Sequence, residues 1–220
     1  MSKFVEVKQI LHTSSYGIRK NIPKLLENCE LLSFDCETRS VYTKEERAEA
    51  KAYLKSSDPS DKLYKHARVV TESSGLSYPS IVKTTHFIFG ESKNKVHTVI
   101  CNSPEMEIFL WNLVSDYTGT FLVHNSLFDF KICYQRTGRL PKNFIDTALF
   151  VKCLINHVNI WKAKVGLKEL VGDYYPPSWS LYSDYEPVNL KNEKFLTYCS
   201  YDGSAMFTLY ELIQEELKEE

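Results

Sequence analysis

Two acidic side chains, Asp35 and Glu37, end an apolar run of the sequence and stand one residue apart. Successive side chains of a strand alternate between its two faces, so on a strand both carboxylates would point the same way. Two carboxylates held together repel each other and lose hydration unless a positive charge lies between them. A divalent cation such as Mg²⁺ is the simplest such charge, because hard ions bind carboxylate oxygens. The triplet alone is a weak pattern, since a strand end whose acids face solvent has the same sequence.

Two further acids occur in patterns that could place them beside the first pair. Asn125 and Asp129 are four residues apart, and they share a face if a helix begins just after Asn125. Tyr198 and Asp202 have the same spacing within a long helical pattern over about 192–217. Each spacing is common on soluble helices, where it usually means only a solvated pair. Together, and in this order, the three patterns form a constellation that chance rarely produces.

The order D-x-E, H-N-x-x-F-D and Y-x-x-x-D resembles the three exonuclease motifs of the DEDD superfamily of 3′–5′ exonucleases. The tyrosine four residues before the last aspartate resembles the tyrosine subgroup, which includes proofreading domains of DNA polymerases and RNase D-like enzymes. Residues 144–149 and 166–170 also look like the region between the family's second and third motifs. The similarity is strongest to the exonuclease part of bacteriophage family A DNA polymerases. It spans about residues 31–217, except for 38–84, which match nothing in that family.

The resemblance implies a set of site residues and a two-metal-ion mechanism with Mg²⁺ or Mn²⁺ as cofactor. The implied metal ligands are four carboxylates: Asp35 bridging both ions, Glu37 and Asp202 completing the site of the attacking water, and Asp129 holding the other ion. Tyr198 would orient that water, because a phenol with a pKa near 10 is a better orienter than base at pH 7. The implied substrate-binding residues are Thr38, His124, Asn125 and Phe128, with Asn125 hydrogen bonding to the terminal nucleotide and Phe128 packing against it.

The function expected from the resemblance is removal of nucleoside monophosphates from single-stranded or frayed DNA 3′ ends, for proofreading or for DNA replication and repair. No polymerase region follows in the sequence, so the protein would proofread in trans beside a separate polymerase subunit, or be one domain of a longer polymerase. An RNase D-like exoribonuclease is an alternative, because no pattern shows how a 2′-hydroxyl is treated, although no helical RNA-binding domain follows. A catalytically inactive module that binds nucleic acid or a partner is another, against which the intact acids argue.

Composition agrees with one exonuclease domain over residues 1–220. A content of 43% hydrophobic and 25% charged residues is ordinary for a globular protein of this length. No apolar run approaches the roughly 20 residues needed to cross a bilayer, and the first residues lack an apolar secretory signal. The six cysteines include no C-x-x-C pair, so zinc is not expected. A cytoplasmic protein, in the host cytoplasm if phage-encoded, fits these features.

The net charge is −1, but basic residues gather in one part of the chain. Residues 130–168 contain one acid, Asp146, and eight bases: Lys131, Arg136, Arg139, Lys142, Lys152, Lys162, Lys164 and Lys168. As a group, this basic belt could neutralise the phosphates of an entering strand. Solvated helix faces would have the same composition.

The hydrophobic patterns predict an α/β fold with a mixed sheet of three antiparallel strands plus parallel strands, flanked by helices. This is the plan of the ribonuclease-H-like fold that the resemblance to the DEDD superfamily implies. Strands are expected at 30–36, 83–89, 96–101, 121–124 and 144–146, and helices at 103–114, 126–137, 147–155 and 192–217.

Two segments stand outside this plan. Residues 38–80 are expected as an insertion near the active site, with a helix over 43–55 and a loop over 56–80. This insertion could cover the strand entrance, contact a partner, or be a surface excursion. Residues 174–182 are rich in aromatic residues and proline. Their rings could stack on bases, and they could equally fasten the loop to the core, which is the interpretation we favour.

Overall fold

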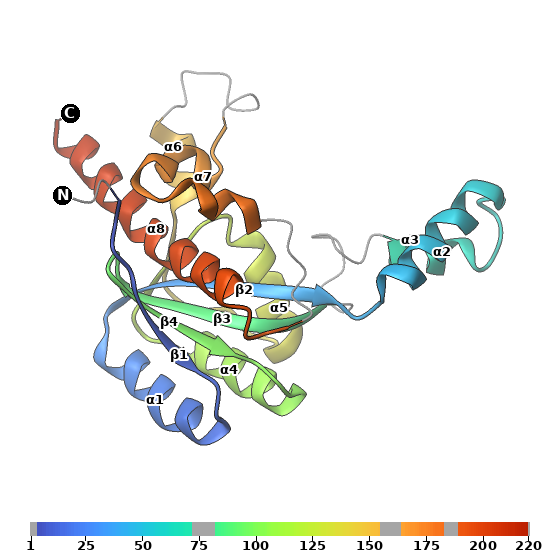
Figure 1. Ribbon diagram of the computed structural model, residues 1–220, viewed down its shortest axis with the longest axis horizontal. Helices are drawn as coiled ribbons and strands as arrows, with labels where there is room; N and C mark the ends of the chain where they lie inside the picture. The colour runs from blue at the N-terminus through green and yellow to red at the C-terminus, as the bar shows by residue number, and fades with distance from the viewer. Residues whose placement is uncertain (1–3, 72–81, 155–163, 183–188, 220) are drawn as a thin grey trace.

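The fold is built on one mixed sheet, seen in a computed structural model that describes residues 4–71, 82–154, 164–182 and 189–219 (Figure 1). Its strands lie in the order β1-β4-β3-β2-β5-β6. Their bounds are β1 Lys8–His12, β2 Leu31–Ser40, β3 Val82–Ser92, β4 Lys95–Ile100, β5 Thr120–Val123 and β6 Phe144–Asp146. β3 is antiparallel to β2 and β4, whereas β5 is parallel to β2 and β6. The predicted α/β class with three antiparallel strands and parallel strands is therefore confirmed.

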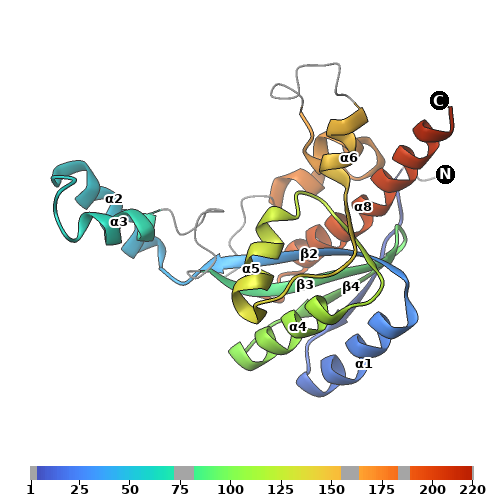
Figure 2. The ribbon, with the colours of Figure 1, turned by 180° about the vertical axis from the view of Figure 1, so that it is seen from behind.

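Helices cover both faces of this sheet (Figures 1 and 2). On one face α1, α4 and α5 pack against Phe34 and Phe87 in the main core, and on the other face α8 crosses β2, β3 and β4. The helices are α1 Ser15–Asn28, α2 Lys44–Ser56, α3 Tyr64–Thr71, α4 Pro104–Asp116, α5 Leu127–Thr137, α6 Thr147–Leu154, α7 Leu167–Val171 and α8 Glu193–Glu219, with the short 3₁₀ helices η2 Gly172–Tyr174 and η3 Pro177–Tyr182. None of the helices in the described part of the chain is both long and apolar enough to cross a membrane.

A glycine allows α8 to approach the sheet closely. A Cβ atom added at Gly203 would lie 2.7 Å from Ile88 Cγ2 and 2.9 Å from Val96 Cγ1. Ser33 donates a 2.6 Å hydrogen bond from β2 to the carbonyl oxygen of Gly203. These contacts fix the height and the register of α8 over β2, and hence the position of Asp202, the next residue along.

The first strand and the first helix were not predicted from the sequence. β1 is an edge strand that runs parallel to β4, with Gln9 opposite Val96. α1 contains Gly17 and Pro23, two residues that disfavour a helix interior and obscure its pattern. It still buries Ile18 and its neighbours on one side in the main core.

The segment expected as an insertion forms a helical hairpin that stands away from the body of the protein (Figures 1 and 2). The helix predicted over 43–55 is present as α2, and Thr43 caps it in a capping box with Glu46. The prediction of a loop over 56–80 was wrong in part, because residues 64–71 form α3; residues 72–81 lie outside the described part of the chain. Only Ala67 and Val70 of α3 are buried, so the apolar signal for this helix was weak. β2 continues to Ser40, opposite Val82, before the hairpin begins.

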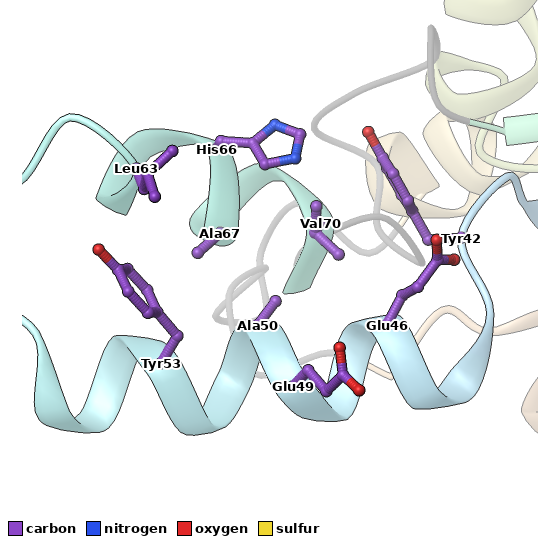
Figure 3. Close-up of a pocket in the computed structure, with 9 residues that line it drawn as sticks. All are labelled: Tyr42, Glu46, Glu49, Ala50, Tyr53, Leu63, His66, Ala67 and Val70. Carbon is purple, nitrogen blue, oxygen red and sulfur yellow. The ribbon is translucent and has the colours of Figure 1, made fainter.

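A hollow of about 400 Å³ lies between the two helices of this hairpin (Figure 3). Ala50 of α2 and Val70 of α3 line it from opposite sides, and Glu46 and Glu49 of α2 also line it. Among the residues that the structure describes, no lysine or arginine lines it.

Candidate active site

Two elements bring three carboxylates together. Asp35 and Glu37 lie on β2, opposite Ile88 and His86 of β3, and Cys36 between them is buried on the other face. Oxygen atoms of Asp35, Glu37 and the buried Asp202 of α8 lie within 4.8 Å of one another. The predicted same-face arrangement of the first two acids and their proximity to Asp202 are what the structure shows.

The surroundings of these acids disfavour their charged forms. Burial, reinforced by the charges of Asp129 and Glu37, raises the pKa of Asp35 well above its usual value. Burial and the charge of Asp202 raise the pKa of Glu37 to about 8. Burial also raises the pKa of Asp202. A nearby positive charge would stabilise the charged forms of these three carboxylates. A set of hard oxygen donors without histidine or cysteine suits Mg²⁺ or Mn²⁺. The three carboxylates therefore fit a divalent cation.

Lys168 of α7 supplies one positive charge to the group. Its ammonium lies 3.2 Å from Asp202 Oδ1 and 3.3 Å from the Tyr198 hydroxyl oxygen. It also lies over two aromatic rings, 4.5 Å from the centre of Tyr198 and 5.0 Å from that of Trp179. Sequence reasoning counted this lysine only as a member of the basic belt. Its place between two aromatic residues and an acid depends on how α7 packs against α8.

Trp179 of η3 is the second residue that sequence reasoning did not assign to the site. Its indole Nε1 donates a 2.9 Å hydrogen bond to Asp202 Oδ1. Its ring is buried against Tyr175, with ring centres 4.8 Å apart, in the core beneath α8. The aromatic segment 174–182 thus fastens to the core, as favoured, and in doing so it also holds a carboxylate of the site.

Tyr198 lies one helical turn before Asp202 on α8, as predicted from the spacing. Its ring stacks with Phe195 at 5.6 Å, and its side chain is 9% exposed. Burial, followed by the negative charges of Asp202 and Glu37, raises the pKa of its phenol above the usual value of 10. The hydroxyl therefore keeps its proton at neutral pH and can donate a hydrogen bond.

Asp129 is close to the three carboxylates but is held differently. It lies in the first turn of α5, and its Oδ1 accepts a 3.1 Å hydrogen bond from the Cys36 backbone N–H of β2. Burial raises its pKa to about 6, although the hydrogen bond from Cys36 opposes that shift. Asp129 also contributes to the raised pKa of Asp35. It borders the site without joining the group within 4.8 Å.

The turn before α5 shows that the expected shared face of Asn125 and Asp129 was wrong. α5 begins at Leu127, and Asn125 has a left-handed backbone with φ of 62°, so Asn125 and Asp129 do not share a helix face. Asp146 at the end of β6 holds this turn, because its carboxylate accepts from the N–H groups of Asn125 at 3.0 Å and Ser126 at 2.8 Å. Burial alone would raise the pKa of Asp146, but these hydrogen bonds outweigh it and leave the pKa lowered.

The four residues expected to bind substrate differ in their exposure and in their contacts. Asn125 is exposed at the turn, and Phe128 is half-buried against the main core. Thr38 follows an irregularity in the pairing of β2 that begins after Glu37. A hydrogen bond between His124 Nδ1 and Thr147 Oγ1, 2.9 Å long, holds the imidazole ring in place.

Several residues of the basic belt have acidic partners within the protein. Arg136 forms a 3.1 Å ion pair with Glu107, and Arg139 pairs with Asp116, both on α4. Lys168 enters the candidate active site, and Lys162 lies outside the described residues. The charges of Arg136, Arg139 and Lys168 are therefore compensated by carboxylates of the protein itself.

No protein-family model matches the chain, and no curated protein matches its sequence. Solved structures do share its fold. Brucella melitensis NrnC has a TM-score of 0.56 and 14% identity over 98% of this chain and 83% of its own, and it is also known with bound Mg²⁺ and bound to pGG. Escherichia coli RNase D, an exoribonuclease involved in structured RNA processing, has a TM-score of 0.59 and 13% identity over 97% of this chain and 46% of its own. The Aedes aegypti Nibbler EXO domain has a TM-score of 0.62 and 11% identity, with 98% and 93% covered. This chain therefore has the fold of these proteins.

Proposed function

We propose that this protein is a metal-dependent 3′–5′ exonuclease of the DEDD superfamily. The observation that carries the proposal is the group of three carboxylates from β2 and α8 beside the hydroxyl of Tyr198. The fold shared with NrnC, which is known with Mg²⁺ and with pGG, supports a metal and a nucleic acid at this site. So does the order of the three sequence motifs that carry these residues.

Each residue has a role in phosphodiester hydrolysis under this proposal. Asp35, Glu37 and Asp202 hold a divalent cation, and Asp129 provides a fourth carboxylate if two ions bind. When bound, such ions lower the pKa of water and offset the charge of the phosphate. The Tyr198 hydroxyl orients the attacking water. Lys168 keeps that hydroxyl and the Asp202 carboxylate in place, and its ammonium adds positive charge near the phosphate.

The substrate is a single strand with a free 3′ end. The sequence motifs favour DNA, with proofreading beside a separate polymerase subunit in the cytoplasm as the setting. RNA is the second candidate, since the fold is shared with E. coli RNase D, an exoribonuclease. A paired end must fray before it reaches recessed carboxylates, at a cost of order 1–2 kcal/mol per base step, so paired ends react more slowly.

The test uses DNA and RNA oligonucleotides of one sequence, labelled at the 5′ end and incubated with Mg²⁺ or Mn²⁺. We expect a ladder that shortens from the 3′ end, requires the metal, and disappears with EDTA and in the Asp35→Asn variant. The faster of the two polymers identifies the substrate. Immediate release of a labelled 5′ mononucleotide, or rapid cutting of a circular strand, would contradict the proposal. Tight binding without hydrolysis of either polymer would replace it with an inactive binding module.

A further inference from the structure

A second hollow, of about 330 Å³, adjoins the candidate active site between α8 and η3. Of the described residues, six line it: Ser178, Trp179, Lys194, Thr197, Tyr198 and Tyr201. The last four have the spacing of one helix face, so α8 forms one wall and η3 forms the other. Its volume lies within the roughly 300–1,000 Å³ typical of small-ligand sites.

The chemistry of this lining suits a nucleotide. It combines three aromatic rings, two of them phenols, with the hydroxyl groups of Ser178 and Thr197 and one ammonium, and none of its lining residues in the described part of the chain carries a carboxylate. Aromatic rings stack on bases of any sequence, hydroxyl groups can bond to base edges, and a lysine binds phosphate as a point charge. The hollow of the α2–α3 hairpin is the opposite case, because its described lining has two glutamates and neither lysine nor arginine, and the glutamates repel phosphate (Figure 3).

The aromatic wall is held rigidly from behind by Tyr175. This fully buried tyrosine contacts Trp179 and also Tyr201, whose ring centre lies 5.6 Å away at 61°. Its hydroxyl oxygen lies 2.7 Å from the hydroxyl oxygens of Ser204 and Thr208. A wall that is already ordered loses little entropy when a ligand binds. In front of the wall, Tyr201 is half-buried and Lys194 is exposed, so both can reach a ligand.

Two residues belong to both the hollow and the active site. Tyr198 and Trp179 line the hollow, and both also contact Lys168. The hollow and the carboxylates therefore lie on two sides of the same pair of side chains, so a strand with a phosphate at the carboxylates lies beside the hollow. We propose that the hollow binds the nucleotide next to the one being removed, with its base against Tyr201 and its phosphate near Lys194. This inference rests on the proposed exonuclease function.

The test measures binding of a ten-nucleotide, 5′-fluorescein-labelled oligothymidylate in EDTA, and KM for the same strand with Mg²⁺. Lys194→Ala is compared with Lys191→Ala, which removes an exposed lysine outside the hollow. Tyr201→Leu is compared with Tyr201→Phe, which keeps the ring, and thermal melting checks that all four variants fold.

We expect Tyr201→Leu to weaken binding, or to raise KM, at least about fivefold, the lower end for loss of a stacked base, with kcat unchanged. Lys194→Ala should lower the slope of log affinity against log salt by about 0.7, the value for one phosphate contact with a single strand. Lys191→Ala and Tyr201→Phe should match the parent protein.

The two proposals fail in different ways. If Lys194→Ala and Tyr201→Leu match their controls in affinity, KM and salt slope, the nucleotide site is wrong even if the protein is an exonuclease. If neither the parent protein nor any variant hydrolyses DNA or RNA, the exonuclease proposal is wrong. If Lys194→Ala and Tyr201→Leu still change binding as expected, the hollow is nevertheless a site that binds a nucleic-acid strand.

Discussion

Replacing Lys168 by methionine tests the electrostatic account of the candidate active site. The variant keeps an unbranched side chain of similar length but removes the ammonium that lies 3.2 Å from Asp202 Oδ1. Without metal, the buried carboxylates then face each other without this compensating charge. We expect the metal-free protein to lose stability, and added Mg²⁺ to restore much of it, because the cation replaces the missing positive charge.

The size of the loss follows from the geometry. At 3.2 Å and an effective dielectric constant of about 20, the Coulomb attraction is about 5 kcal/mol. Removing one partner of a buried pair typically costs about 3–5 kcal/mol. The Lys168 side chain is 28% exposed, and the carboxylates can take up protons instead, so we expect the lower end, about 3 kcal/mol. For a protein of this size that is a fall in Tm of roughly 6–12 °C.

The assay is thermal unfolding in EDTA and again in a Mg²⁺ series. Lys164→Met is the matched control, since it removes a lysine from the same segment whose side chain is 82% exposed and lies 3.6 Å from Glu169. An exposed pair contributes about 0–1 kcal/mol, so this control should melt close to the parent protein. Equal Tm values for the two variants in EDTA, or no extra Mg²⁺ stabilisation of Lys168→Met, would refute the reasoning.

Two other predictions concern single side chains. Tyr198→Phe should lower turnover about tenfold, which is less than the 10²–10⁴-fold typical of a lost proton-transfer group. The Mn²⁺ concentration that gives half the maximal rate should not change. A change in that concentration would contradict the role of Tyr198 in orienting water. His97→Gln should reduce the pH dependence of stability between about pH 7.5 and 5.5. His97 lies 2.9 Å from His12, and burial lowers its pKa below 6.5 although Glu91 opposes this. The unfolded chain therefore binds more protons below pH 6.5, and the parent protein loses stability as pH falls. Urea unfolding at both pH values measures this, with the exposed His66→Gln as control; an equal pH dependence in His97→Gln and the parent would count against it.

The sequence predicted the parts of the site that depend on local periodicity. Alternation along β2 placed Asp35 and Glu37 on one face, and the helical spacing placed Tyr198 one turn before Asp202. The sheet class followed from apolar runs with clear turns between them. These predictions needed no knowledge of how distant elements pack.

The parts that the sequence did not predict depend on tertiary contacts or on weak local signals. Lys168 and Trp179 meet Asp202 only because α7 and η3 pack against α8. Asn125 was expected to share a face with Asp129, but the hydrogen bonds from its turn to Asp146 hold it in a left-handed conformation before the helix begins. α3 buries only two side chains, so its sequence lacks the apolar stripe by which a helix is recognised.

The central claim is that the carboxylates of β2 and α8 hold a divalent cation. Electron paramagnetic resonance of free Mn²⁺ in a titration with the protein tests it most directly, because it needs no substrate. The parent protein and the control Asp173→Asn, an exposed aspartate outside the acid group, should bind Mn²⁺ equally. Asp202→Asn should bind it at least about 10–100-fold more weakly. Equal Mn²⁺ affinity in Asp202→Asn and the parent protein would contradict the account.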